Sequence, residues 1–429
     1  MRPSAVRLVH RVHQWTGVAS AANLLVLALT GILLIFHEEI DEALGAVPPA
    51  AAVAPGVPRA SLASVVEAAR RREPALALRY VSADPEDPTR LFVTMQPPAL
   101  HGEAGAKILT YDARTGAYLA ALPEAGGITG WVLKLHTELF LGDFGKGYVA
   151  AVGVAFLVSL LTGVVIYAPF ARRLGFGVVR PVRPARAPRA EGAAARAGFW
   201  DRRTLAADLH RLLGPATLVW NLVVAATGVM LAVTTWLLPY YQRTVLVPLT
   251  AAYASRPAPA HPVPLDSAVR TALRAYPNSR FTFVAFPGSD FAGPANYLFF
   301  SAGTSPVESR LLKPTLVDAR DGALIAAPPL PWYLTAALLS GPLHFGDYGG
   351  TPLKVVWVGF ALITVVLAGS GVYIPLARRF ATRGAGSGDR PDDPADDALA
   401  EALGEADGAP ALAGAGAGTG ALASARGRA

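Results

Sequence analysis

The stretch LHTELFLGDFGKGYVAAVGVAFLVSLLTGVVIY, residues 135–167, joins a histidine, a long apolar run and a Thr-Gly pair. Its apolar part, Tyr148–Ala168, contains no charged residue and is long enough to cross about 30 Å of hydrocarbon as a helix. Three further stretches have a similar character: Val18–Phe36, Gly214–Leu238 and Val355–Pro375. The sequence therefore predicts an integral membrane α-helical protein with four transmembrane helices.

A fifth uncharged stretch, Gly322–Leu343, is not counted as a span. Its prolines, among them Pro328 and Pro331, each cost a helix interior roughly 3 kcal/mol. An interfacial or loop segment is expected there instead. The first span could alternatively be a cleaved signal peptide, but Val18–Phe36 exceeds the usual apolar core of about 7–15 residues, and two glutamates follow it directly. A retained helix is the favoured interpretation.

The composition agrees with a membrane protein and excludes several kinds of chemistry. Of the 429 residues, 52% are hydrophobic and only 16% are charged, whereas soluble domains carry about 25% charge. The chain has no cysteine. Disulfides, thiolate zinc or iron–sulfur sites, a catalytic cysteine and covalent C-x-x-C-H haem attachment are therefore excluded. Any redox cofactor has to be held non-covalently by other ligands.

The basic residues lie in three segments that four spans place on one side of the membrane. These are the N-terminus, the connection 171–203 with its nine arginines, and the stretch just after the fourth span. The positive-inside rule predicts that both termini are cytoplasmic in a multi-pass protein that contacts lipid. The net charge of +7 is then a topology signal, and no nucleic-acid partner is expected. Connection 171–203 and the Ala/Gly-rich tail after about residue 384 are expected to be disordered.

Two segments on the other side show the same order of expected elements. A helix at Ser61–Glu73 or Leu265–Tyr276 precedes extended stretches, and the turns Asp112–Gly116 and Asp318–Gly322 follow. The extended stretches are Leu78–Ser82, Leu91–Met95, Lys107–Tyr111, Phe281–Phe286, Tyr297–Ser301 and Leu316–Val317. Each segment is predicted to be a small α+β module on the outer side of the membrane. The chain is thereby divided into 1–37 (cytoplasmic N-terminus and first span), 38–147 (first module), 148–168 (second span), 169–209 (cytoplasmic basic loop), 210–238 (third span), 239–351 (second module), 352–376 (fourth span) and 377–429 (disordered cytoplasmic tail).

Each span also carries a hydroxyl–glycine pair, and histidines keep a fixed distance from it. The pairs are Thr30-Gly31, Thr162-Gly163, Thr227-Gly228 and Ser370-Gly371. By themselves they indicate close helix packing through small residues. His13 and His210, however, each lie 17 residues before their pair, and His136 and His344 each lie 26 residues before theirs. Four of the eight histidines thus occupy matched positions in a duplicated unit, which predicts two parallel repeats.

Parallel repeats related by an axis along the membrane normal would place matched histidines opposite each other. His13 would face His210 near the cytoplasmic side, and His136 would face His344 near the outside. Two facing imidazoles among apolar and small residues are typical of a b-type haem with two histidine ligands. One such haem near each face would form an electron path across the bilayer. The alternatives are polar interfacial histidines, or zinc or copper at the outer pair.

The remaining histidines are not repeated. His37 ends the first span on the outer side and is a further candidate ligand or substrate contact. His10, His101 and His261 receive no role. Aromatic residues near the outer pair, Trp131, Phe140, Phe144, Trp332, Tyr333, Phe345 and Tyr348, are typical interfacial anchors. Catalytic and substrate-binding residues are not identified by any pattern.

Three stretches make the sequence recognisable: the run quoted first, the start HQWTG…LTGILLIFHEEID and the end PLHFGDYGG…SGVYIPLARR. They resemble the PepSY-associated transmembrane family over about residues 8–380. The resemblance implies that the protein lies in a bacterial inner (cytoplasmic) membrane and that the two outside segments are periplasmic α+β PepSY-like modules. The family includes iron-regulated membrane proteins and ferric-siderophore reductases, so it also implies haem b, with His13, His210, His136 and His344 as ligands. It further implies a periplasmic ferric siderophore or similar chelate as electron acceptor.

Three functions remain in competition. The first is a haem-dependent ferric-chelate reductase that acts in iron uptake, with a separate cytoplasmic reductase or quinol as donor. The second is a non-enzymatic PepSY membrane protein that binds or regulates periplasmic partners, with structural histidines. The third is a quinol-linked haem electron carrier with a protein acceptor. The haem content separates the second function from the other two.

Overall fold

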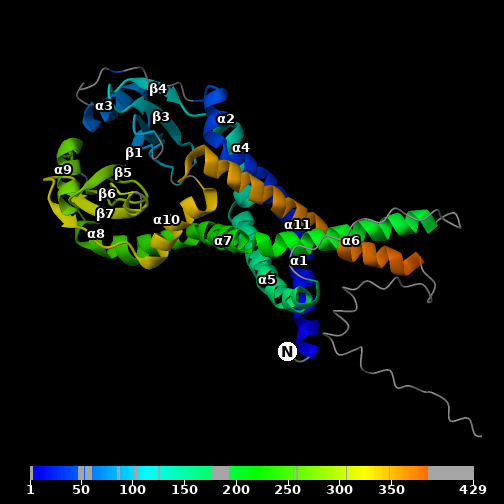
Figure 1. The fold of residues 1–429 in the computed structure, drawn as a ribbon. Coiled ribbons are helices and arrows are strands. Elements are labelled where there is room, and N and C mark those ends of the chain that lie inside the picture. The colour runs from blue at the N-terminus through cyan, green and yellow to red at the C-terminus, as the bar shows by residue number, and fades with distance from the viewer. Residues whose placement is uncertain are drawn as a thin grey trace, which may run out of the picture.

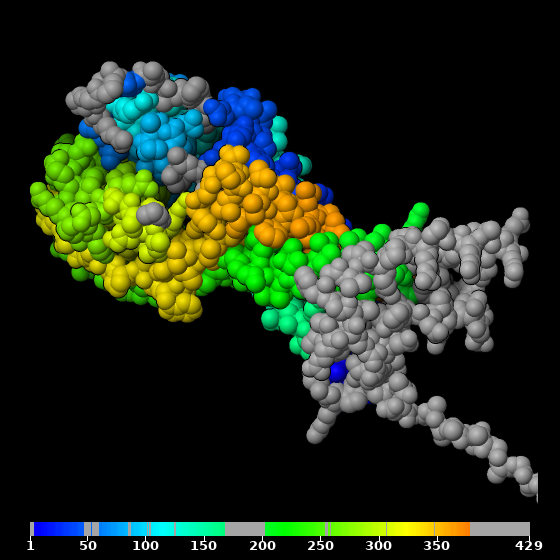
Figure 2. Space-filling view, in the orientation of Figure 1, coloured from blue at the N-terminus to red at the C-terminus, as the bar shows by residue number. Residues whose placement is uncertain are grey.

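The structure is a computed structural model with a long helical part and an α/β part (Figure 1). It describes residues 3–46, 53, 60–84, 87–100, 102, 104–123, 126–174, 193–254, 256–257, 259–305, 307–346 and 348–384. The tail expected to be disordered lies outside the described residues from 385 onward. In the space-filling view, α10 and the start of α11, coloured yellow to orange, pack at the junction of the two parts (Figure 2).

Four helices of the described chain are long and apolar enough to cross a membrane, which confirms the four predicted spans. They are α1 (Pro3–Ile35), α5 (Gly142–Leu174), α7 (Leu218–Tyr241) and α11 (Gly350–Gly384). Helix α1 packs against α5 and α11, and α5 packs against α7. Many large apolar side chains on these helices stay exposed, such as Leu161 at 58% and Val219 at 75%. An apolar outer surface of this kind is suited to lipid.

Two expectations for the connecting segments are corrected. Helix α6 (Ala193–Ala216) includes the end of the connection 171–203, so residues 193–203 are helical rather than disordered, while residues 175–192 lie outside the described chain. Helix α10 (Trp332–Phe345) occupies the second half of the proline-containing stretch, so the loop alternative is wrong there, whereas an interfacial position stays a prediction. Its N-terminus follows Pro331, where a proline fits without loss of a hydrogen bond, and it also accommodates Pro342.

The third span is interrupted at one end and extended at the other. Helices α6 and α7 are separate because Thr217 between them has non-helical dihedrals, and Pro215 lies just before it. At the other end, α7 continues through a π-helical turn η2 (Gln242–Leu246) into α8 (Val247–Ala254). In Figure 1, α6 and the C-terminal part of α11 extend to the right, whereas the N-terminal end of α1 and the end of α5 point downward.

The strands form one eight-stranded antiparallel sheet in the order β4-β3-β2-β1-β5-β6-β7-β8. The expected extended stretches are confirmed, with two short strands in addition. The bounds are β1 (Ala77–Ala83), β2 (Arg90–Gln96), β3 (Lys107–Asp112), β4 (Tyr118–Ala121), β5 (Ser279–Ala285), β6 (Asn296–Gly303), β7 (Leu312–Asp318) and β8 (Leu324–Ala326). Strand β1 of the first segment pairs with β5 of the second through Tyr80–Ala285, Val81–Val284 and Ser82–Phe283. The two segments therefore share a single sheet.

Helices cover both faces of this sheet. On one face lie α3 (Leu62–Arg72) and α9 (Leu265–Ala275), which contact each other and bury residues such as Val65 and Ala268. On the other face, the continuation of α7 and helix α10 pack against the half formed by β5–β8. Tyr241, Leu298 and Leu334 form part of that second core. The third span is thus joined directly to the sheet.

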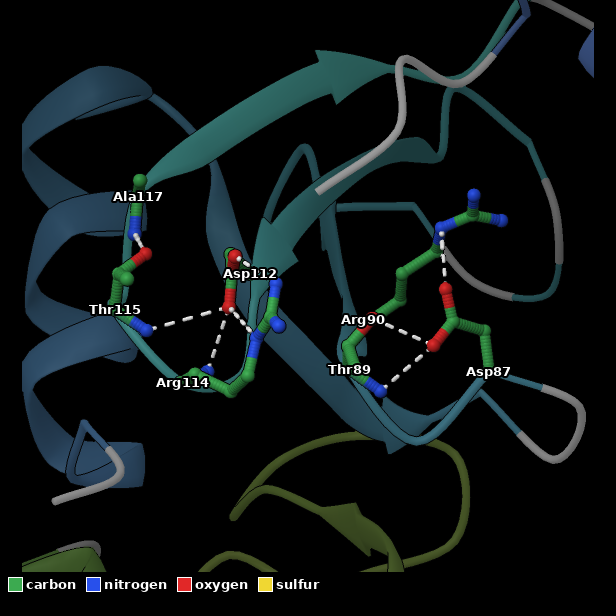
Figure 3. A network of polar contacts seen from close by, with 7 residues as sticks. All are labelled: Asp87, Thr89, Arg90, Asp112, Arg114, Thr115 and Ala117. Atoms are coloured by element: carbon green, nitrogen blue, oxygen red, sulfur yellow. Dashed lines mark hydrogen bonds and ion pairs between the residues drawn. The ribbon is translucent and has the colours of Figure 1, made fainter. Parts of the chain in front are cut away.

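The two predicted Asp-to-Gly turns adopt the same local structure. In the first, Asp112 Oδ1 accepts hydrogen bonds from the backbone N–H of Arg114 at 2.8 Å and of Thr115 at 3.3 Å (Figure 3). The Arg114 guanidinium lies 3.0 Å from Asp112 Oδ2. In the second turn, Asp318 Oδ1 accepts from the backbone N–H of Arg320 at 2.8 Å. Aspartate is favoured at this position because its carboxylate accepts hydrogen bonds from the backbone N–H groups of the turn that follows it.

Candidate functional site: two histidine pairs

The four histidines at matched sequence positions form two facing pairs. His13 of α1 and His210 of α6 have ring centres 6.4 Å apart with planes at 77°. His136 belongs to α4 (Gly127–Glu138), and its ring centre lies 6.2 Å from that of His344 of α10, with planes at 70°. The structure therefore brings together the partners that the spacing predicted. Each pair joins residues about 200 positions apart in the chain.

In the first pair, the Nδ1 atoms are turned toward neighbouring helices. His13 Nδ1 lies 2.9 Å from the Ser159 carbonyl oxygen and 3.3 Å from Thr162 Oγ1, both on α5. His210 Nδ1 lies 2.9 Å from Ser370 Oγ on α11. Each imidazole is thus held by a hydroxyl residue of another span.

The second pair has the same type of contacts. His136 Nδ1 lies 2.9 Å from Thr30 Oγ1 on α1. His344 Nδ1 lies 3.0 Å from the Val224 carbonyl oxygen and 3.3 Å from Thr227 Oγ1, both on α7. Among the described residues, no hydrogen bond reaches Nε2 of any of the four histidines.

The glycine of each hydroxyl–glycine pair lies against the same imidazole as its hydroxyl neighbour. A Cβ atom added at Gly228 would lie 2.9 Å from His344 Cε1, and one at Gly163 would lie 3.1 Å from His13 Cε1. The corresponding distances are 3.4 Å from Gly31 to His136 and 3.6 Å from Gly371 to His210. The hydroxyl–glycine pairs therefore contact the histidines, in addition to letting the helices pack closely.

The two pairs lie well apart along the helical part. His13 and Thr30 are on the same helix, and 17 residues at about 1.5 Å each correspond to roughly 25 Å. Since Thr30 contacts His136, this rise approximates the separation of the two pairs. Such a separation is close to the thickness of the hydrocarbon core, about 30 Å.

The other histidines lie outside both pairs. His37 begins α2 (His37–Ala43), is exposed, and its Nδ1 lies 2.9 Å from the Leu34 carbonyl oxygen. His261 is exposed, and His101 lies outside the described residues. Within the described chain, no group of three or more His, Asp or Glu side chains is arranged to hold a metal ion.

Two contacts around the second pair have no counterpart in the sequence analysis. The Trp357 indole N–H on α11 donates to the His344 carbonyl oxygen at 3.2 Å. Lys354 on the same helix lies 2.8 Å from Glu39 and 3.6 Å from Glu38, which ties the start of α11 to α2. Of the aromatic residues expected nearby, Trp131 and Trp332 are 61% and 77% exposed, as interfacial anchors would be.

Comparison with known proteins finds a matching family but no matching curated protein. A family model described as the PepSY-associated TM region matches residues 10–379, which includes all four paired histidines and both α/β segments. The match covers far more than half of the 429 residues. The chain therefore belongs to the PepSY-associated transmembrane family.

Proposed function

We propose that this membrane protein is a b-type dihaem electron-transfer protein. His13 and His210 would hold one haem, and His136 and His344 would hold the other. The observation that carries the proposal is the distance between facing rings, 6.4 Å and 6.2 Å. Metal–imidazole bonds of about 2 Å, with roughly 1.1 Å from each ring nitrogen to its ring centre, would separate two ring centres by about 6 Å. The residues present therefore fit a metal bound between them.

The proposal also uses the orientation of each imidazole. With Nδ1 turned toward α5, α11, α1 or α7, Nε2 is the nitrogen available to a metal. A histidine ligand commonly donates its other N–H to a carbonyl or similar acceptor, and the contacts here have that form. When bound, haem iron would supply a one-electron carrier at each pair. The chain's own residues provide the apolar helical surroundings and hold the rings in place.

The proposed topology follows the distribution of arginines. The pair His13–His210 would lie toward the cytoplasmic side of a bacterial inner membrane, and the pair His136–His344 toward the periplasm. The chain would be duplicated, with two PepSY-like modules outside. A quinol or a separate cytoplasmic reductase would deliver electrons to the first pair. A separation of roughly 25 Å along α1 would let the two sites together span the bilayer.

The proposed acceptor is a ferric siderophore or another ferric chelate in iron uptake. One electron converts Fe(III) to Fe(II), and a chelator built for Fe(III) then binds the iron less tightly. This assignment rests on family resemblance, since no contact around the second pair identifies a chelate. A protein acceptor is the competing reading, and a non-enzymatic PepSY protein with structural histidines is the other alternative.

The experiment is an absorption spectrum of detergent-purified protein, oxidised and reduced with dithionite, with haem quantified per chain. We expect about two haems with the sharp reduced bands of low-spin, six-coordinate iron. His136→Ala and His344→Ala should each remove one haem, and His13→Ala and His210→Ala should each remove the other, while His261→Ala serves as a surface control. Absence of haem after expression with ample haem supply would refute the proposal in favour of the non-enzymatic reading. Reoxidation of the reduced protein by a ferric siderophore then tests the acceptor.

A further inference from the structure

The four hydroxyl–glycine pairs contact the four histidines crosswise. In the first half of the chain, the pair on α1 holds His136, and the pair on α5 holds His13. In the second half, the pair on α7 holds His344, and the pair on α11 holds His210. We propose that these pairs are positioning elements that fix the proton of each imidazole on Nδ1 and thereby tune the metal held at Nε2. The placement of the proton on Nδ1 is independent of the proposed haem function, and only the tuning of a bound metal rests on that function.

The position of the proton follows from counting donors. A hydroxyl group has one hydrogen, and three of these hydroxyls already donate it to a backbone carbonyl four residues earlier, each at 2.7 Å: Thr30 to Val26, Thr162 to Val158 and Thr227 to Val223. Ser370 donates to the Leu367 carbonyl at 3.0 Å. The hydroxyl oxygen that faces Nδ1 can then only accept. Nδ1 must therefore carry the proton, and Nε2 keeps its lone pair for a metal.

Backbone carbonyls lead to the same assignment. The Ser159 carbonyl oxygen lies 2.9 Å from His13 Nδ1, and the Val224 carbonyl oxygen lies 3.0 Å from His344 Nδ1. A carbonyl oxygen has no hydrogen to donate, so both nitrogens are donors. His136 and His210 likewise have a backbone hydrogen bond, with Leu27 and Leu367, beside a hydroxyl at 2.9 Å.

The glycines make the close approach of the hydroxyls possible. Each glycine follows its hydroxyl residue on the helix and leaves the space beside Cε1 that a methyl group would fill. At Gly228 and Gly163 an added methyl group would push the imidazole away from the helix, and Nδ1 would leave hydrogen-bond distance, whereas at Gly31 and Gly371 it would make ordinary contact. The hydroxyl and the glycine therefore act together at His344 and His13.

A hydrogen bond from Nδ1–H makes an imidazole a stronger donor to a metal. Stronger donation stabilises ferric relative to ferrous iron, so loss of the bond should raise the reduction potential of the haem. The effect should be larger for Thr30→Val and Ser370→Ala than for Thr162→Val and Thr227→Val, because the hydroxyl oxygens of Thr30 and Ser370 lie closer to Nδ1, at 2.9 Å against 3.3 Å. A backbone carbonyl remains as an acceptor at all four histidines, so each shift should be partial.

The test is a redox titration of both haems in Thr30→Val, with Thr30→Ser as the conservative variant and Thr162→Val as the matched comparison. We expect an upward shift of the midpoint potential of the haem held by His136 and His344, no shift of the other haem, and restoration in Thr30→Ser. Thr162→Val should cause a smaller shift, and only in the haem held by His13 and His210. Full haem content with unchanged potentials in all variants would overturn the proposed tuning.

A second measurement separates this inference from the haem proposal. Nitrogen-15 NMR of histidine-labelled, haem-free protein reports which ring nitrogen is protonated. We expect Nδ1–H at all four paired histidines in the wild type and a mixture of tautomers at His136 in Thr30→Val. Protonation of Nε2 in the wild type would overturn the proposed fixing of the proton on Nδ1, whether or not haem binds. A wild-type protein that binds no haem but carries Nδ1–H would refute the proposed function and still support the role of the hydroxyl–glycine pairs in placing the proton.

Discussion

Val81 and Val284 pair with each other where the two α/β segments meet, and neither side chain has any exposed surface. They lie on β1 and β5, at the centre of the eight-stranded sheet. Only three residue pairs join these strands, whereas seven join β6 to β7. The seam therefore depends strongly on the apolar contacts at its centre.

Val81→Asp should weaken the sheet at this seam. An unpaired carboxylate in an apolar core costs about 3 kcal/mol or more of unfolding free energy. Limited proteolysis and denaturant unfolding in detergent would measure the loss. The same charge at an exposed position of β8, Leu324→Asp, is the control, since Leu324 is 48% exposed. Equal stability of the two variants would show that the seam does not hold the segments together.

Gly228→Ala and Gly371→Ala test the space beside the histidines. The added Cβ would lie 2.9 Å from His344 Cε1 in the first variant and 3.6 Å from His210 Cε1 in the second. The first distance forces the imidazole to move, whereas the second is ordinary contact. We expect Gly228→Ala to lower haem affinity by about 10–100-fold, as loss of a ligand-orienting contact does, and Gly371→Ala to change it little. Transfer of haem to a haem-free acceptor protein measures the haem affinity of both variants. Equal haem affinities would contradict the difference in space beside His344 and His210.

Asp112 should make the stability of the first turn depend on acid pH. Burial raises the pKa of this carboxyl, but hydrogen bonds from the Arg114 side chain and from the Arg114 and Thr115 backbone outweigh burial, so the pKa lies below its ordinary value. A lowered pKa in the folded state stabilises the fold above the unfolded-state value of about 3.9, and this contribution is lost as the pH falls through the folded-state pKa.

Asp112→Asn removes that contribution at neutral pH. We expect the wild type to exceed the variant in unfolding free energy by a constant amount from about pH 5 to 8, with the difference shrinking below about pH 4. Denaturant unfolding at a series of pH values provides the measurement. A difference that is independent of pH down to strongly acidic conditions would show that the ionised carboxylate is not the stabilising form.

The absence of cysteine makes the topology directly testable, because a single introduced thiol has no background. Arg202 on α6 and Ala323 beside the second Asp-to-Gly turn are both exposed. With the proposed orientation, a membrane-impermeant maleimide should label Ala323→Cys in cells with a permeabilised outer membrane. Arg202→Cys should react only after lysis. Labelling with the opposite pattern would reverse the orientation.

His37→Ala should leave the haem content unchanged. The His37 side chain is exposed and lies outside both facing pairs, and its Nδ1 contacts the Leu34 carbonyl of its own segment. Haem quantification beside His136→Ala provides the comparison. Loss of one haem in His37→Ala would restore this residue as a ligand, which was one sequence-based expectation.

The sequence made much of the candidate site predictable. The equal spacing of His13 and His210, and of His136 and His344, from their hydroxyl–glycine pairs indicated which histidines face each other. It did not indicate that Thr30 contacts His136, because that contact joins residues 106 positions apart on different helices. The pairs by themselves are equally consistent with ordinary close packing.

The sequence alone determined the four spans and the strands within each α/β segment, because apolar length and alternation are local properties. Only the tertiary structure decided that β1 and β5 join the segments into one sheet, since strand pairing depends on edges brought together from distant parts of the chain. It also decided that residues 193–203 belong to helix α6, which as a whole packs against α11, a partner that the local sequence does not reveal. The crossed arrangement of hydroxyl, glycine and histidine likewise exists only once the helices are packed.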